Sequence, residues 1–389
     1  MKTKQTTQTA ITKGMGLYIH IPFCASKCAY CDFLSFEGMG ADVQRRYVQA
    51  LIAEMKAAHE EYHTAVDTVY IGGGTPTALP STLLCEILYE VQNFDLLPGA
   101  EITLEMNPCT NLLSTLADFR SLGVNRLSIG LQAWQDEFLR GLRRTHTSAQ
   151  FTETMQSARD AGIDNINVDL MFGLPWQALW HWRESLTQVI AHEPQHISAY
   201  SLTPAENTPL WDALEAGRLN LPSESTDRAM YYEAVNLLTA AGYEHYELSN
   251  FAKPKRESQH NVNCWLRKPY IGFGLGAHSF DGNKRWHNTL DMGRYLSMLE
   301  DDCCANLRED VEVLSTQDAM AEAMFLGLRM TGGVNPQDFY NNFGISVTDT
   351  YGQEIETLVS KGLLISTSEK ICLTPLGLDL ANQVFEAFV

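Results

Sequence analysis

Three cysteines stand close together near the start of the chain, in the segment GLYIHIPFCASKCAYCDF. Cys24, Cys28 and Cys31 follow an apolar run and have the spacing C-x3-C-x2-C. Three thiolates can bind three irons of a [4Fe–4S] cluster and leave the fourth iron open to another ligand. Structural zinc has four ligands, usually two cysteine pairs, so zinc with a distant fourth ligand is a weaker interpretation, as are incidental cysteines. The trio therefore predicts an open iron–sulfur site.

Further residues suited to binding a ligand stand where apolar runs end. The segment YIGGGTP places Gly73, Gly74 and Thr75 after one run, and glycines there would let the backbone approach a ligand closely, although a plain tight turn is the alternative. Later runs contain polar residues near their ends: Glu105, Gln132 and Asp169. A charged side chain in a buried strand needs a partner, so three such residues at successive run ends indicate one shared polar pocket.

Six short apolar runs, which must position these residues, alternate with segments of helical period. The runs are 17–21, 68–74, 101–107, 126–132, 166–173 and 196–203. Alternation of strand and helix predicts right-handed β-α-β units and a parallel sheet, either open or closed into an incomplete barrel. The loops at the carboxyl ends of such strands converge to build sites, and the cysteines follow the first run on such a loop.

The pattern changes after the sixth run. A helix is expected at 224–241, a mixed glycine-rich segment follows, and from about residue 310 helices precede a small β-wing at 361–377. We predict an α/β fold, a partial (β/α)6 TIM-like barrel with a small C-terminal winged-helix-like α+β domain. Its parts are a mobile N-terminal tail (1–14), the barrel (15–241), a linking region (242–305) and the C-terminal helical domain (306–389).

Charge and composition exclude several classes of protein. The net charge is −19, which disfavours a broad nucleic-acid surface, and residues 308–389 hold four Lys/Arg against twelve Asp/Glu. No apolar run is long enough to span a membrane, and the polar N-terminal tail lacks the centre of a signal peptide. The nine cysteines do not form a spaced disulfide framework, so we expect a protein of the reducing cytoplasm.

The cysteine motif, with Tyr30 before its last cysteine, resembles that of the radical S-adenosylmethionine (SAM) superfamily. The flanking LYIHIPFC and KCAYCDF are similar to the branch that contains oxygen-independent coproporphyrinogen III dehydrogenase and the HemW-type haem chaperones. The resemblance runs from about residue 16 to 389 and implies a radical SAM barrel, a [4Fe–4S] cluster, SAM on its open iron and an electron donor. It implies that SAM is contacted by Tyr18, Tyr30, Gly73, Gly74, Thr75, Glu105, Gln132, Arg144 and Asp169.

Within that resemblance, Arg144 would pair either with the SAM carboxylate or with one of the acids, and Asp169 would suit a ribose hydroxyl. Two features separate the branches. The dehydrogenases carry a further cysteine where this chain has Phe33, and they have a longer N-terminal extension. Both differences favour the chaperone branch.

A second motif, HNVNCW followed by GLGAH, resembles the H-N-x-x-Y-W and G-x-G-A-H stretches that HemW-type proteins associate with haem. The resemblance implies haem contacts by His260, Asn261, Cys264 and Trp265, although Cys264 stands where the family has tyrosine. On a helix, His260 and Cys264 would share one face, and both could approach a porphyrin; simple packing is the alternative. Five cations between 253 and 268 would suit haem propionates, or form an ordinary solvated surface.

The function these features favour is that of a haem chaperone. It would bind haem and, with its cluster and SAM, pass haem to acceptor haemoproteins such as respiratory enzymes, while peripheral to the inner membrane. The alternatives are coproporphyrinogen III dehydrogenase, which removes carbon dioxide from propionates, and a radical SAM methyltransferase that opens haem. Whether SAM is turned over stays open, so no residue is assigned a catalytic role.

Overall fold

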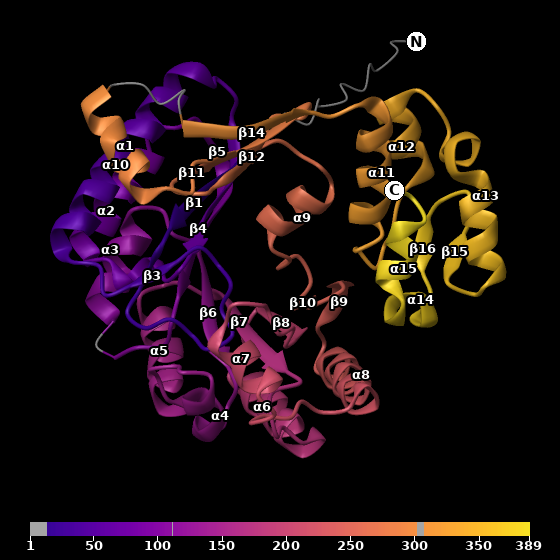
Figure 1. Cartoon of the computed structure of the whole chain (residues 1–389), viewed down its shortest axis with the longest axis horizontal. Helices are drawn as coiled ribbons and strands as arrows, with labels where there is room; N and C mark the ends of the chain where they lie inside the picture. The colour runs from indigo at the N-terminus through magenta and orange to yellow at the C-terminus, as the bar shows by residue number, and fades with distance from the viewer. Residues whose placement is uncertain (1–13, 111, 302–306) are drawn as a thin grey trace, which may run out of the picture.

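The protein, seen in a computed structural model that describes residues 14–110, 112–301 and 307–389, is built around one twelve-stranded sheet (Figure 1). Six neighbouring strands run parallel in chain order. They are β1 (Met15–Ile21), β4 (Val66–Gly73), β5 (Leu96–Met106), β6 (Arg126–Gln132), β7 (Asn165–Phe172) and β8 (His196–Ser201). All six predicted runs are strands, and the predicted barrel is confirmed. The expected tail, apart from Gly14, lies outside the described residues.

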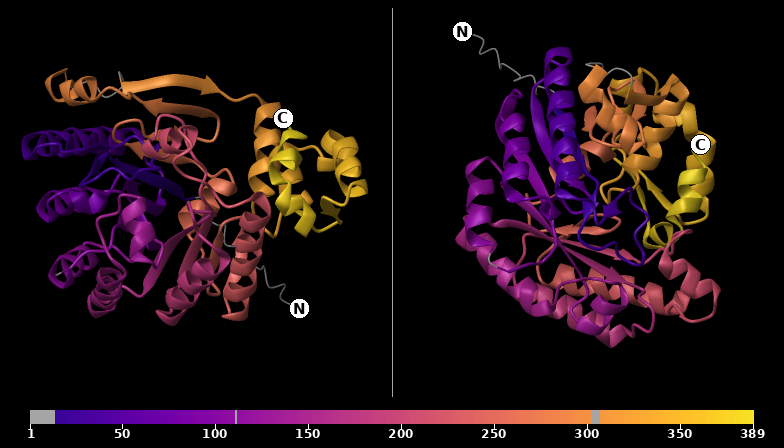
Figure 2. Two further views of the ribbon diagram at one scale, coloured as in Figure 1. Left: turned by 60° about the horizontal axis from the view of Figure 1, so that its bottom comes forward. Right: turned by 60° about the vertical axis from the view of Figure 1, so that its left-hand side comes forward.

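Helices cover the outer face of the curved sheet, and Figure 2 shows this cover from two further sides. They are α1 (Ala41–Glu61), α2 (Ser81–Val91), α3 (Leu113–Ser121), α5 (Ser148–Asp160), α6 (Leu179–Ala191) and α8 (Glu224–Ala240). The short helices α4 (Asp136–Gly141) and α7 (Pro209–Glu215) pack instead with Ala29 of the cysteine loop, and a 3-10 turn lies at Pro76–Ala78. Because the other face of the strands closes on the barrel interior, a central strand is covered on both sides. All seven residues of β6 are buried, which explains why such strands are nearly continuous apolar runs.

Residues 242–305, expected to form a linking region, extend the sheet at both edges. On one side β10 (Asn250–Ala252) pairs with β8, and β9 (Glu244–Glu247) pairs with β10. On the other side β11 (Tyr270–Phe273) pairs in parallel with β1. The strands beyond it are β12 (His278–Phe280) and β13 (Lys284–Asn288), followed by β14 (Arg308–Val313), which already belongs to the segment expected to form the C-terminal domain. The remaining elements of this segment are α9 (Gln259–Trp265) and α10 (Met292–Asp301).

The C-terminal part is a small helical unit with its own apolar core, built around residues such as Met324, Phe339 and Ile355. Its helices are α11 (Thr316–Gly327), α12 (Pro336–Phe343), α13 (Val347–Ser360), α14 (Pro375–Asp379) and α15 (Ala381–Glu386). The predicted β-wing is present as β15 (Leu364–Ser366) paired with β16 (Ile371–Leu373). None of the helices within the described ranges is long and apolar enough to cross a bilayer.

The glycine turn after β4 packs directly against the chain that leaves β1. The amide of Gly74 donates to the carbonyl of Ile21 at 2.9 Å, and the amide of Thr75 donates to that of Phe23 at 2.8 Å. A Cβ atom on Gly74 would lie 2.7 Å from the Phe23 carbonyl oxygen, a distance that packed atoms do not tolerate. Glycine is therefore needed at position 74 so that the segment leaving β1 can pack against the turn. This packing fixes the position of Cys24, which follows Phe23 in that segment.

We predict that Gly74→Ala lowers the free energy of unfolding by about 1–3 kcal/mol, because backbone atoms must move to admit the methyl group. Urea unfolding followed by circular dichroism measures the loss. Gly141→Ala is the matched control, since nothing lies within 4 Å of its Cβ position, and it should change stability by less than about 1 kcal/mol. Equal stability of the two variants would show that the turn has room to relax.

Candidate functional site

A cavity of about 760 Å³ opens at the carboxyl ends of the parallel strands. It is lined by all but one of the residues that the sequence assigned to the cluster and to SAM: Cys24, Cys28, Tyr30, Cys31, Gly73, Gly74, Thr75, Glu105, Gln132, Arg144 and Asp169. The exception is Tyr18, which is not among the lining residues and whose hydroxyl lies 3.0 Å from Nδ1 of His20. The predicted shared pocket is thus confirmed, while the role of each residue stays a prediction.

Backbone hydrogen bonds hold the cysteine loop against the barrel. The short strands β2 (Phe23–Cys24) and β3 (Phe36–Glu37) pair at its ends, and the amide of Ala29 donates to the carbonyl of Leu142 at 3.0 Å. In the described part of the chain, no three His, Cys, Asp or Glu side chains are placed to hold a single metal ion. The cysteine loop instead offers three thiols, the donor set that three irons of a [4Fe–4S] cluster would use.

A polar arc joins two of the three cysteines. Arg144 donates from Nη1 to Sγ of Cys28 at 3.4 Å and from Nη2 to Oδ1 of Asn107 at 2.6 Å. The amide nitrogen of Asn107 donates to Oγ1 of Thr75 at 3.2 Å, and that hydroxyl lies 3.7 Å from Sγ of Cys24. Hydrogen bonds to the ligand sulfurs help to set the reduction potential of an iron–sulfur cluster. If these thiols bind a cluster, the arc would influence its reduction potential and would orient Cys24 and Cys28.

This geometry corrects one expectation and adds one residue. Of the two expected partners of Arg144, an acid of the pocket is not in contact with it in the described residues; it contacts Cys28, Asn107 and the carbonyl of Gly130, and its pairing with SAM stays a prediction. Asn107 was missed by the sequence reasoning, although it follows β5 directly, in the segment EMNP. The rule that selected Glu105, a polar residue at a strand end, also applies to Asn107.

The two acids of the pocket are held by neutral donors. Glu105 accepts from the hydroxyl of Tyr70 at 2.7 Å and from the amide of Gly73 at 3.2 Å. Asp169 accepts from Ser128 at 3.1 Å and from the Asn167 amide nitrogen at 2.7 Å. Burial, and then the charge of Asp169, raise the pKa of Glu105 to about 7. Within the described residues neither acid makes an ion pair, so a cationic group of a ligand would be favoured beside them.

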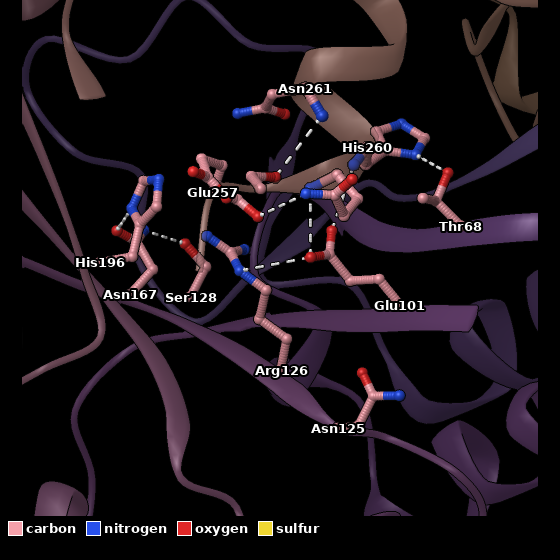
Figure 3. A network of polar contacts seen from close by, with 12 residues as sticks. Thr68, Glu101, Asn125, Arg126, Ser128, Asn167, His196, Glu257, His260 and Asn261 are labelled. Atoms are coloured by element: carbon pink, nitrogen blue, oxygen red, sulfur yellow. Dashed lines mark hydrogen bonds and ion pairs between the residues drawn. The ribbon is translucent and has the colours of Figure 1, made fainter. Parts of the chain in front are cut away.

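Helix α9 packs against β4 near the amino end of that strand, and Figure 3 shows the polar contacts that hold it there. The backbone amides of Gln259 and His260 donate to the carboxylate of Glu101 on β5, each at 3.2 Å. Nδ1 of His260 lies 3.0 Å from Oγ1 of Thr68 on β4. The second motif is therefore part of the floor of the barrel.

The four residues of that motif are not all brought to the cavity. Asn261 lines it, whereas His260, Cys264 and Trp265 are not among its lining residues. Burial, and then the charge of Arg126, lower the pKa of His260 to about 4, so its imidazole is neutral. Burial raises the pKa of Cys264 to about 11, so it is a thiol. The predicted helical spacing of His260 and Cys264 is present on α9.

The five cations between 253 and 268 do not form one free basic surface. Lys253 lies over the ring of Tyr243, with its Nζ 4.0 Å from the ring centroid. Arg267 pairs with Glu322 of α11 at 2.8 Å, and Lys268 pairs with Asp67 at 3.6 Å. Three of the five cations are thus partnered by groups from distant parts of the sequence, and the binding of propionates by this segment stays a prediction.

Comparison with known proteins shows what the chain resembles. The model of the Radical SAM superfamily matches residues 18–189, and that of the HemN C-terminal domain matches residues 314–380. A protein of Escherichia coli (strain K12) named "Heme chaperone HemW" is 39% identical over 388 residues, which covers 96% of this chain and 98% of that protein. The protein of the same name from Bacillus subtilis (strain 168) is 34% identical over 376 residues, covering 96% and 98%.

A solved structure of coproporphyrinogen III oxidase (HemN) from Escherichia coli has the same fold. It superimposes with a TM-score of 0.84 and covers 97% of this chain and 90% of that one, at 22% sequence identity. At this identity the likeness concerns the fold alone.

We predict that replacing Cys24, Cys28 or Cys31 by Ala abolishes cluster assembly, because no neighbouring thiol can substitute for the missing ligand. Iron and sulfide analysis after anaerobic reconstitution should give about four of each for the wild type and a near-complete loss for each variant. Cys85→Ala and Cys109→Ala are the controls, since neither residue lines the cavity. Retention of iron in any variant of the trio would contradict the assignment of the ligands.

Proposed function

Because the chain belongs to the HemW family of haem chaperones within the radical SAM superfamily, we propose that it binds haem and passes it to acceptor haemoproteins, using a [4Fe–4S] cluster and SAM. One observation carries the proposal: a single cavity connects the three-cysteine loop at one end of the barrel with α9, the helix of the haem motif, at the other. Respiratory enzymes as acceptors, and delivery at a membrane surface, stay predictions.

The cysteine loop is suited to holding the cluster. Its donor set of three thiols matches three irons, and a cluster bound there would supply an open iron for SAM and an electron for SAM cleavage. Arg144 and Thr75 donate toward the sulfurs of Cys28 and Cys24, which orients these two thiols toward the cavity. The electron donor would approach from the open side of the cavity, where Phe33 is 65% exposed.

The acids are suited to holding SAM. Glu105 is oriented by Tyr70 and Gly73, and as a carboxylate it can only accept hydrogen bonds, which suits the ammonium of the methionine part. Asp169 can accept from the ribose hydroxyls. Gln132, fixed by the hydroxyl of Tyr200 at 2.7 Å, lies on the strand between them.

We predict that Glu105→Gln and Asp169→Asn each weaken SAM binding about tenfold or more, because each removes a charge-assisted hydrogen bond, while iron content is kept. Since the pKa of Glu105 is about 7, protonation as the pH falls from 8 to 6 should weaken SAM binding in the wild type and much less in Glu105→Gln. Anaerobic calorimetry measures both effects. Glu86→Gln on α2 is the control, and unchanged affinity in a folded double variant would restrict the acids to a structural role.

For haem, we predict that His260→Ala lowers affinity, because it removes the imidazole that joins α9 to β4. Cys264→Tyr, which introduces the tyrosine of the family pattern, should keep binding, since Cys264 is not among the residues that line the cavity. Titration of ferric haem followed at the Soret band measures both. A changed Soret band in Cys264→Tyr, or haem retained by the wild type after acid–acetone extraction, would instead place the sulfur at the porphyrin.

The chaperone proposal can be separated from the two enzymatic alternatives by product analysis. Phe33 stands at the position where coproporphyrinogen III dehydrogenases are expected to have a further cysteine, and it lines the cavity. Anaerobic incubation with coproporphyrinogen or haem, together with SAM and a reductant, should leave both tetrapyrroles unchanged in mass spectra. A decarboxylated or ring-opened product would overturn the proposal.

A further inference from the structure

Arg126 is a buried cation on the floor of the cavity that the cluster and SAM do not account for. It is the first residue of β6, its side chain is 2% exposed, and it lines the cavity at the end that α9 closes (Figure 3). The other residues around it are neutral amides, hydroxyls and one imidazole: Ser128, Asn167, His196, Ser198, Asn250 and Asn261. Among the described residues, Arg126 is the cation that lines this end of the cavity, the floor chamber, and the buried carboxylate of Glu101 lies beside it.

The charge of Arg126 is only partly balanced. Its nearest carboxylate, Glu101, is 3.9 Å from Nε, beyond hydrogen-bond distance, and that carboxylate already accepts from the amides of Gln259 and His260. Nε of Arg126 and Oδ1 of Asn250 are buried without a hydrogen-bond partner in the described parts of the chain. A buried polar group without a partner costs free energy, and a guanidinium in a cavity wall recovers it by binding an anion in forked geometry.

His196 and His260 do not supply the missing acceptor. His196 is held between Oδ1 of Asn167 at 2.6 Å and the hydroxyl of Tyr246 at 2.8 Å. The charge of Arg126 contributes, after burial, to lowering the pKa of both imidazoles, so both are neutral. The acids of the pocket, Glu105 and Asp169, make no ion pair with Arg126 within the described residues. Within the described residues Nε of Arg126 thus has an ion-pair partner but no hydrogen-bond acceptor, and a ligand can supply one.

We propose that the floor chamber binds a carboxylate group of a ligand on Arg126, with a propionate of haem as the expected source. This deepens the proposed function and rests on it, because it gives the orientation of the cargo: propionate toward β6, beside Asn261 of the haem motif. Three of the cations between 253 and 268 are partnered elsewhere, whereas Nε of the buried Arg126 has no hydrogen-bond partner in the described residues. A free carboxylic acid has the same chemistry and is the second possible source.

The test compares haem with its dimethyl ester, which lacks both carboxylates, on the full chain with its cluster reconstituted anaerobically. Wild-type protein should bind haem about tenfold to a hundredfold more tightly than the diester, the range expected for a charge-assisted pair. Arg126→Gln should bind the two equally. Because Arg126→Gln removes the ion-pair partner of the buried Glu101, which lowers stability, the double variant Glu101→Gln/Arg126→Gln removes the pair as a unit and should also lose the preference.

Arg45→Gln is the matched control, because Arg45 on α1 also lies 3.9 Å from its carboxylate partner, Glu86, but on the exposed surface. It should keep the wild-type preference for haem. If the folded double variant still distinguishes haem from the diester as the wild type does, the inference is overturned.

A second arm separates the two sources of the carboxylate. Succinate should raise the melting temperature of the wild type and not of Arg126→Gln if the chamber accepts free acids. Should the wild type bind no haem and yet respond to succinate, the chaperone proposal fails while the carboxylate site stands with a free acid as ligand. Absence of both responses overturns the site itself.

Discussion

The cavity depends on one backbone contact, that between the chain leaving β1 and the glycine turn after β4. Parallel strands bring their carboxyl ends together, but the cysteine loop can lie beside the turn only because Gly74 has no side chain to meet the Phe23 carbonyl. The turn then places the Thr75 hydroxyl next to Cys24, and the amide of Gly73 next to Glu105. The close approach of these two segments thus sets the positions of the Cys24 thiol and of the Glu105 carboxylate, which lie on different strands.

Much of this arrangement could be predicted from the sequence, because its causes are local. A strand covered on both faces must be apolar along its length, so the six strands could be recognised as apolar runs. A polar residue at the end of such a run indicates a binding site, because its burial needs a partner. Glu105, Gln132 and Asp169 were found in this way. Arg126 is also a polar residue at the end of an apolar run, but it stands at the amino end of its strand. Residues at the amino ends of the strands were not expected to line a site.

Pairings between distant segments could not be predicted. Thr68 and His260 are 192 positions apart, and nothing in either segment says that α9 folds under the barrel. Charge summed along 253–268 gave a basic surface, whereas Arg267 and Lys268 are paired with Glu322 and Asp67 from elsewhere in the chain. Net charge in a window is a property of the sequence, but free charge is a property of the fold.

The sheet continues without interruption past the six barrel strands, and this determines where the chain can be divided. Since β11 pairs with β1 and β10 pairs with β8, both outer strands of the barrel have partners from residues after 241. A fragment that stops at 241 would expose the backbone donors and acceptors of two apolar strands, which is the usual starting point of aggregation. We expect the smallest independently folding piece to extend through β14. The cysteine loop and the haem motif therefore belong to one folding unit and cannot be separated by truncation.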